Sequence, residues 1–139
     1  MKKMRILVLV LACILAVGVL ASCSSDKVTA NVTISVVADD DAILTNYEIA
    51  VVGTADAPPT VLQAMREAML MHDAISFSDN GASVIGIAGY EEAEDEDFTY
   101  FWEYTINGVA ATSGKAIDNT IKEGDAIRFT YATVDKSKL

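Results

Sequence analysis

Cys23 is the residue whose neighbours most clearly predict a covalent modification. It ends the segment Leu20-Ala21-Ser22-Cys23, in which small residues precede the cysteine. This is the pattern of a lipobox, where the thiol receives a diacylglyceryl group and a peptidase then cleaves the chain before the cysteine. The alternative is an ordinary secretory signal in which the cysteine is incidental.

The segment before Cys23 has the layout of a signal peptide. Its first five residues include three basic ones, and residues 6–21 are apolar and uncharged. That run is shorter than the roughly 20 apolar residues of a membrane-spanning helix. We expect residues 1–22 to be a lipoprotein signal peptide and residues 23–27 to be a short lipidated tether.

One domain is expected after the tether, over residues 28–135. The lipid on Cys23 would anchor it in the cell membrane, on the extracytoplasmic face. Cys13 would leave with the signal peptide, so no second cysteine would remain to form a disulfide. The core alone must then stabilise the fold.

The charge of the chain excludes some partners. The formal net charge is −10, and removal of residues 1–22, which hold three basic residues and no acidic one, would change it to −13. Nucleic-acid binding needs a basic surface, so we exclude a nucleic-acid partner. Anionic lipid headgroups would repel the domain, whereas a cationic partner would be attracted to it.

The sequence shows no set of residues that predicts catalysis or a metal site. His72 is the only histidine, and a zinc-type site needs further His or Cys ligands. Residues 91–97 contain six acidic residues but no glycine, unlike a calcium-binding loop, so we expect a solvated loop there. Phosphate loops and hydrolase motifs are absent from the sequence. We therefore expect no enzyme and no metal, and no cofactor beyond a bound small molecule.

The sequence of the first half of the domain predicts a hairpin followed by a helix. Alternating apolar residues predict strands over residues 28–38 and 43–52, joined by a turn at Asp39-Asp40-Asp41. After Pro58-Pro59, Thr60 is placed to cap the helix, and Gln63 stands three residues later to complete a capping box.

The predicted helix carries apolar residues at helical spacing as far as His72. Its methionines, Met65, Met69 and Met71, either fill the core or form a soft-ligand or promiscuous surface. Residues 73–81 are expected to be an irregular connection.

Aromatic and β-branched residues predict a central strand over residues 98–106. One of its faces carries only apolar or aromatic side chains: Phe98, Tyr100, Trp102, Tyr104 and Ile106. Asn107-Gly108 then predicts a type I′ turn, because both central positions need a positive φ, and residues 109–111 would return antiparallel. A last strand is expected over residues 126–134, after a turn at Gly124.

These segments resemble the C-terminal domain of transcobalamin and intrinsic factor, a domain of the DUF4430 type that also occurs in many bacterial surface proteins. The resemblance rests on Phe101-Trp102-Glu103-Tyr104, Asn107-Gly108, Gly114, Lys122-Glu123-Gly124-Asp125 and Ile127, with Ser83-Val84-Ile85-Gly86 as a short strand upstream. It implies an α+β domain with a β-grasp-like mixed sheet and one helix packed across it. The order of the expected elements agrees with that fold class.

The resemblance also implies a function, because in the vertebrate relatives this domain caps a bound cobalamin. We therefore expect a small-molecule binding or capping module whose ligand is a corrinoid or a similar large, flat molecule. The positions that match the ligand-facing parts are Ser83, Val84, Phe101, Trp102 and Tyr104. The alternative for the aromatic residues is that they only fill the core. The alternative function is a surface module for protein–protein interaction or adhesion, without a small-molecule ligand.

The lipobox yields the first testable prediction. Cys23→Ala should abolish incorporation of a labelled fatty acid and block cleavage by the lipoprotein peptidase, because the acceptor thiol is gone. Metabolic labelling followed by gel electrophoresis measures both effects. The matched control, Cys13→Ala, should retain the label, and label retained by the Cys23→Ala protein would contradict the assignment.

Overall fold

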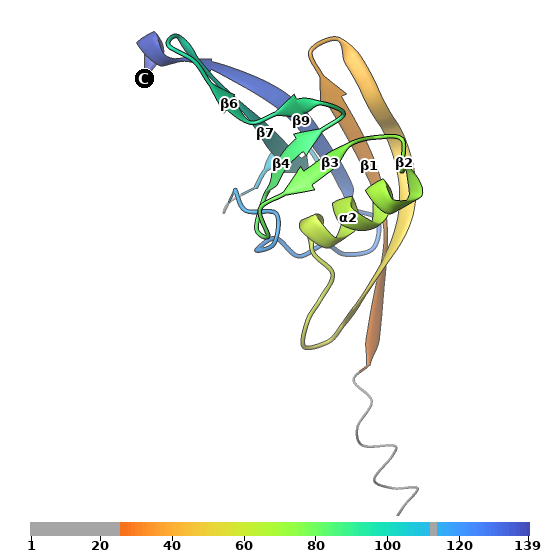
Figure 1. Ribbon diagram of the computed structural model, residues 1–139. Helices are drawn as coiled ribbons and strands as arrows, with labels where there is room; N and C mark the ends of the chain where they lie inside the picture. Colours follow the sequence, from red (N-terminus) through yellow and green to blue (C-terminus); the bar gives the residue numbers. More distant parts are fainter. Residues whose placement is uncertain (1–25, 112–113) are drawn as a thin grey trace, which may run out of the picture.

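The computed structural model describes residues 26–111 and 114–139 as a mixed α+β domain that consists mostly of sheet (Figure 1). The predicted signal peptide, the lipobox and Cys23 lie outside the described residues. Within the described part of the chain, no helix is both long enough and apolar enough to cross a membrane.

The main sheet contains six strands, and its central pair is parallel. The order of the path is β2 (Asp41–Thr54), β1 (Lys27–Ala38), β9 (Ala126–Asp135), β7 (Phe98–Ile106) and β6 (Ala93–Glu94). A further strand, β8 (Val109–Ala110), pairs with the end of β7. Strands β1 and β9 run parallel, while the other neighbouring pairs are antiparallel.

A second sheet of three short strands corrects the expectation of one sheet. It is formed by β3 (Phe77–Asp79), β4 (Val84–Ile87) and β5 (Tyr90–Glu91). The predicted irregular connection over residues 73–81 therefore contains a strand. This strand, β3, pairs with β4, which follows later in the chain. The three residues of β3 are all half-buried, so their local sequence gives little signal for a strand.

The hairpin of β1 and β2 confirms the predicted alternation. Val32, Ile34 and Val36 are buried, while the residues between them are partly exposed. Two residues with positive φ shape the hairpin: Asp39 in the turn, at 51°, and Asn46 at an irregularity in the register, at 46°. Such bulges bend the bulged strand and increase its twist.

Helix α2 (Val61–Met71) begins at the predicted N-cap. The Thr60 side chain accepts a hydrogen bond of 3.3 Å from the Gln63 backbone N–H. The expected return bond from the Gln63 side chain is not made. Instead, Gln63 Nε2 donates to the Val52 carbonyl at 2.7 Å. Val52 lies on edge strand β2, which has a sheet partner on one side only, so its backbone is open to a side-chain donor.

The methionines of α2 divide between core and surface. Met65 and Met69 are buried among the core residues, as the core-filling interpretation predicts. Met71 is 70% exposed, so that interpretation is wrong for this residue. It is the last residue of α2 and follows Leu70, which is also exposed. His72 is the C-cap residue, and its ring contacts Tyr47 edge to face, with 4.5 Å between centroids.

The acidic segment, residues 91–97, is a loop only in part, although its charge predicts a loop throughout. All its side chains are exposed, as expected, but Glu91 belongs to β5, and Ala93 and Glu94 form β6. The backbone of β6 pairs with β7, with Ala93 opposite Tyr100. Charged side chains can occupy this edge strand because they point to solvent while the backbone is paired.

The hairpin of β7 and β8 turns as predicted. Asn107 and Gly108 both have positive φ, at 54° and 79°. Ile106 then pairs with Val109. On β7, Trp102 and Tyr104 are buried while Glu103 is exposed, which confirms the two faces expected for this strand.

Gly108→Val should lower the free energy of unfolding by about 1–2 kcal/mol, because a β-branched residue resists positive φ. A Cβ atom at this position would meet no atom within 4 Å, so the cost lies in the backbone alone. Urea denaturation measures the loss. Gly108→Asn should cost less, since Asn tolerates this conformation, and Ala93→Val on exposed β6 should be nearly neutral. Equal stability of the Gly108→Val protein and the wild type would contradict the turn assignment.

Candidate functional site

The residues predicted to face a ligand are distributed over two sheets and over both faces of the main one. Trp102 and Tyr104 are buried on the inner face of the main sheet, and Val84 is buried on β4 of the three-stranded sheet, which covers that face together with α2. Ser83, just before β4, is half-buried. Phe101 points to the opposite, outer face and is also half-buried. A ligand-facing role for these five residues stays a prediction.

The two buried aromatic residues of β7 have structural partners. Trp102 is 7% exposed, and its indole Nε1–H donates to the Tyr90 carbonyl at 2.8 Å. The hydroxyl of Tyr104 accepts from Asn119 Nδ2 at 2.6 Å, and its ring stacks on Phe129 with 5.0 Å between centroids. Burial is the main influence on Tyr104 and raises the pKa of its hydroxyl.

An open groove of about 380 Å³ lies on the outer face of β7 and β9. Its floor is formed by side chains that alternate with the buried ones: Phe101, Glu103, Thr105, Arg128 and Thr130. One wall is formed by Ala110, Ala111 and Gly114, which follow the Asn107-Gly108 turn. Trp102 and Tyr104 also border this groove, although their rings lie on the other face of the strand.

Arg128 is the cationic side chain in the lining of this groove, which also carries the carboxylate of Glu103. It lies directly across from Thr105 in the β7–β9 register and is exposed. No residue of the described chain forms a hydrogen bond or ion pair with its guanidinium. Phe101 lies opposite the small residue Ala132, so no large side chain stands directly across from it. The groove therefore combines an apolar ring, hydroxyl groups, the carboxylate of Glu103 and a planar cation with free donors.

Sequence reasoning identified Phe101 but missed Arg128. The available signal was its position: Arg128 belongs to the polar side of the alternating segment Ile127-Arg128-Phe129-Thr130-Tyr131. The alternation places it on the outer face, but only the β7–β9 pairing places it beside Thr105.

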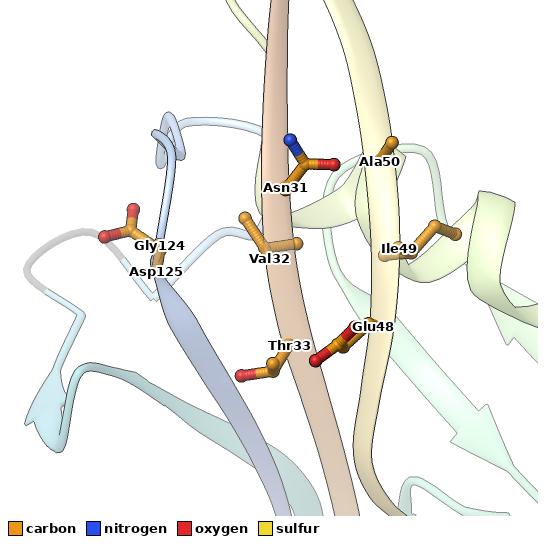
Figure 2. A pocket seen from close by; sticks show the side chains of 8 residues that line it. All are labelled: Asn31, Val32, Thr33, Glu48, Ile49, Ala50, Gly124 and Asp125. Carbon is orange, nitrogen blue, oxygen red and sulfur yellow. The ribbon is translucent and has the colours of Figure 1, made fainter.

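A second groove, of about 430 Å³, lies where β1 and β2 meet the turn before β9. Figure 2 shows its lining side chains, with Asn31 and Thr33 on β1, Glu48 on β2 and Asp125 in the turn. The polar groups of Asn31 and Asp125 already have partners within the protein. The Asn31 backbone N–H donates to Glu123 Oε2 at 2.7 Å, and the Asn31 side-chain amide contacts the same carboxylate. We interpret this groove as a structural joint, by which we mean the place where the turn before β9 is hydrogen-bonded to β1.

Asp125 is the central residue of that joint and is 3% exposed. Its carboxylate accepts hydrogen bonds from Asn107 Nδ2 at 2.8 Å and from the Lys122 backbone N–H at 2.9 Å. Burial, the largest single influence, opposes ionisation, but these hydrogen bonds and the nearby Lys122 ammonium outweigh it. The pKa of Asp125 is therefore below its usual value.

The described residues contain no group of three or more His, Cys, Asp or Glu side chains arranged to hold a metal ion. The longest row of acids, residues 91–97, is fully exposed along its length.

Comparison with known proteins agrees with this architecture. Residues 59–133 match the model of a family described as a domain of unknown function, DUF4430. The chain belongs to this family. No curated protein matches the DUF4430 chain significantly.

The solved structures that are similar to this DUF4430 domain include haptocorrin and a bacterial protein. Haptocorrin in complex with Cbi matches 75% of the chain with a TM-score of 0.55 and 17% identity. The match confirms the resemblance to the transcobalamin family at the level of fold, and the chain spans about a quarter of haptocorrin's length, 25%. A protein from Ruminococcus gnavus ATCC 29149, titled a "putative metal binding protein", matches 74% of the chain and 96% of its own length, at 15% identity and a TM-score of 0.43.

The Asp125 joint yields a prediction about acid stability. Because its pKa is lower in the folded than in the unfolded chain, its carboxylate stabilises the fold fully above about pH 4, the usual range for Asp. That contribution is lost as the pH falls through the folded-state pKa. Asp125→Asn should therefore lower the free energy of unfolding at pH 7 by about 1–3 kcal/mol.

Denaturation at several pH values measures this effect. The wild type and the Asp125→Asn protein should differ most near neutral pH and converge in acid. Asp40→Asn, at an exposed position in the β1–β2 turn, is the matched control and should parallel the wild type. A constant difference between the wild type and Asp125→Asn at every pH would contradict the role of the ionised carboxylate.

Proposed function

We propose that this DUF4430 domain is a non-catalytic binding module that holds a flat small molecule, such as a corrinoid, in the groove on the outer face of β7 and β9. The observation that carries the proposal is that the Phe101 ring and the Arg128 guanidinium line the same open groove. The guanidinium has no hydrogen bond or ion pair within the described chain. Small-molecule sites typically combine an apolar wall with a few placed polar groups.

The two side chains would bind different parts of such a ligand. The Phe101 ring offers apolar contact to a flat ring system. Arg128 can donate two parallel hydrogen bonds to a carboxylate or a phosphate, or single bonds to amide oxygens. Thr105 and Thr130 add hydroxyl groups beside the guanidinium. A corrinoid such as Cbi, the ligand in the haptocorrin structure, combines a large flat ring with peripheral amides.

The open shape of the groove predicts weak binding. Dedicated pockets bury about 70–90% of a ligand, whereas a groove on one sheet face offers a single wall. The association cost is then offset by few contacts. We expect dissociation constants from micromolar to millimolar, or about −8 to −4 kcal/mol.

The proposed location is the extracytoplasmic face of the cell membrane, through a lipid on Cys23. Strand β1 begins at Lys27, so the tether can extend over about 14 Å at roughly 3.5 Å per residue. Anchored in this way, the domain would lie close to the bilayer, with the first residues of β1 nearest to it. We also infer that the sheet order, with a parallel central pair and α2 across one face, is a β-grasp arrangement.

Phe101→Ala and Arg128→Ala should each weaken the binding of Cbi by roughly tenfold, which corresponds to about 1.4 kcal/mol of lost stacking or hydrogen bonding. Isothermal titration calorimetry measures the affinity, and quenching of Trp102, the only tryptophan, gives a second readout once absorption by the ligand is corrected. Val52→Ala, on edge strand β2 and 47% exposed, is the control and should bind as the wild type does. No heat and no corrected quenching at millimolar Cbi would exclude corrinoid binding by this chain alone.

A further inference from the structure

One end of the main sheet extends beyond the elements that cover its inner face. We name this part the distal arm and define it as β6, residues 98–100 of β7 and residues 131–135 of β9. It lies at the opposite end of the sheet from Lys27, because β9 runs parallel to β1 and continues past the last residue of β1 (Figure 1). Helix α2 lies over the other end of the inner face, and the three-stranded sheet meets the arm at Tyr131, whose ring lies 5.3 Å from that of Tyr90.

A row of aromatic rings runs along this inner face from the core to solvent. Tyr131 contacts buried Trp102 with 5.2 Å between centroids and stacks on Tyr100 at 6.2 Å. Tyr100 in turn contacts Phe98 at 6.4 Å. The exposure rises along the row, from 7% at Trp102 to 36% at Phe98. The two outer rings, Phe98 and Tyr100, therefore form a partly exposed aromatic surface.

A carboxylate and a backbone carbonyl fix two of these rings in position. The Tyr100 hydroxyl donates to Asp95 Oδ2 at 3.2 Å, and the Tyr131 hydroxyl donates to the Glu91 carbonyl at 2.7 Å. Desolvation and then the bond to Asp95 raise the pKa of the Tyr100 hydroxyl above its ordinary value. The rings are held before any partner binds, which lowers the ordering cost of binding.

The charge around the rings is strongly negative. Residues 39–41, 91–97 and 135 contain ten of the 20 acidic residues of the chain. The nearby basic residues are Lys136 and Lys138, and Lys136 is already paired with Glu94 at 2.5 Å. A second copy of the chain or an anionic membrane would be repelled from this surface. A cationic segment would be attracted to the acids, and its charged groups could also lie over the ring faces.

We propose that the distal arm is a docking surface for an Arg- or Lys-rich segment of another protein. The basic side chains lie across Phe98 and Tyr100, and their charged groups pair with the surrounding carboxylates. This surface is separate from the groove at Phe101 and Arg128, so it does not depend on the small-molecule proposal. Its position far from Lys27 keeps it accessible whether or not the chain is anchored at Cys23.

The probe is a synthetic peptide in which Arg alternates with Ser, titrated into the domain by fluorescence anisotropy at low and at physiological salt. A peptide with citrulline in place of Arg, which has the same shape without charge, should not bind. Phe98→Leu keeps an apolar side chain but removes the ring, and should weaken Arg-peptide binding by roughly two- to fivefold.

Two double variants with the same net charge test whether the Arg peptide binds at the distal arm. Glu92→Gln with Glu96→Gln removes two exposed acids beside the arm, and should weaken binding by about fivefold or more. Asp56→Asn with Asp73→Asn removes two exposed acids elsewhere, and should bind as the wild type does. Melting curves confirm that each variant is folded.

Several results would overturn the proposal. Equal losses in the two double variants would show nonspecific attraction to an acidic protein. Unchanged affinity of Phe98→Leu would show that the rings take no part. Absence of binding by the wild type, or a dimer in sedimentation that Phe98→Leu dissociates, would show that no cationic segment is the partner of this surface.

Discussion

The start of β9 beside β1 is the junction on which the rest of the structure depends. The Gly124 N–H donates to the Asn31 carbonyl at 2.9 Å, and the Thr33 N–H donates to the Asp125 carbonyl at 3.0 Å. The buried carboxylate of Asp125 then bonds the Asn107 side chain of the β7–β8 turn. One residue thereby joins the parallel pair, the turn before β9 and the last hairpin. A parallel pair needs such a fixed start, because its strands are far apart in the sequence and no tight turn sets their register.

This junction determines which side chains face the groove. Once Ala126 lies beside Thr33, the antiparallel register puts Arg128 opposite Thr105 and Phe129 opposite Tyr104. Phe129 enters the core with 1% exposure, and Arg128 is left on the outer face. A slip of one residue would exchange these two positions, burying a charge and exposing an aromatic ring. Core packing and the chemistry of the groove therefore select the same register.

The two proposed binding surfaces use opposite faces of the same strands. The groove has a cation beside apolar, hydroxyl and carboxylate groups, whereas the distal arm has aromatic rings among acids. Their ligands would differ in charge, so occupation of one surface leaves the other available. The strands that carry both surfaces, β7 and β9, pair along nine residues of β7, from Phe98 to Ile106. That continuous pairing gives each surface a rigid base, as binding sites on strands generally require.

Local sequence patterns predicted the features that depend on local backbone geometry. Alternation identified β1, β7 and β9, Thr60 marked the start of α2, and Asn107-Gly108 marked the hairpin turn, because side-chain period, capping and positive φ are properties of short segments. The tertiary structure decided the features that depend on distant partners. The Gln63 side chain bonds Val52 instead of its own helix cap, Met71 is exposed, and part of the acidic run pairs with β7. Arg128 belongs to a groove only because residues from another strand lie beside it, and no local pattern contains that information.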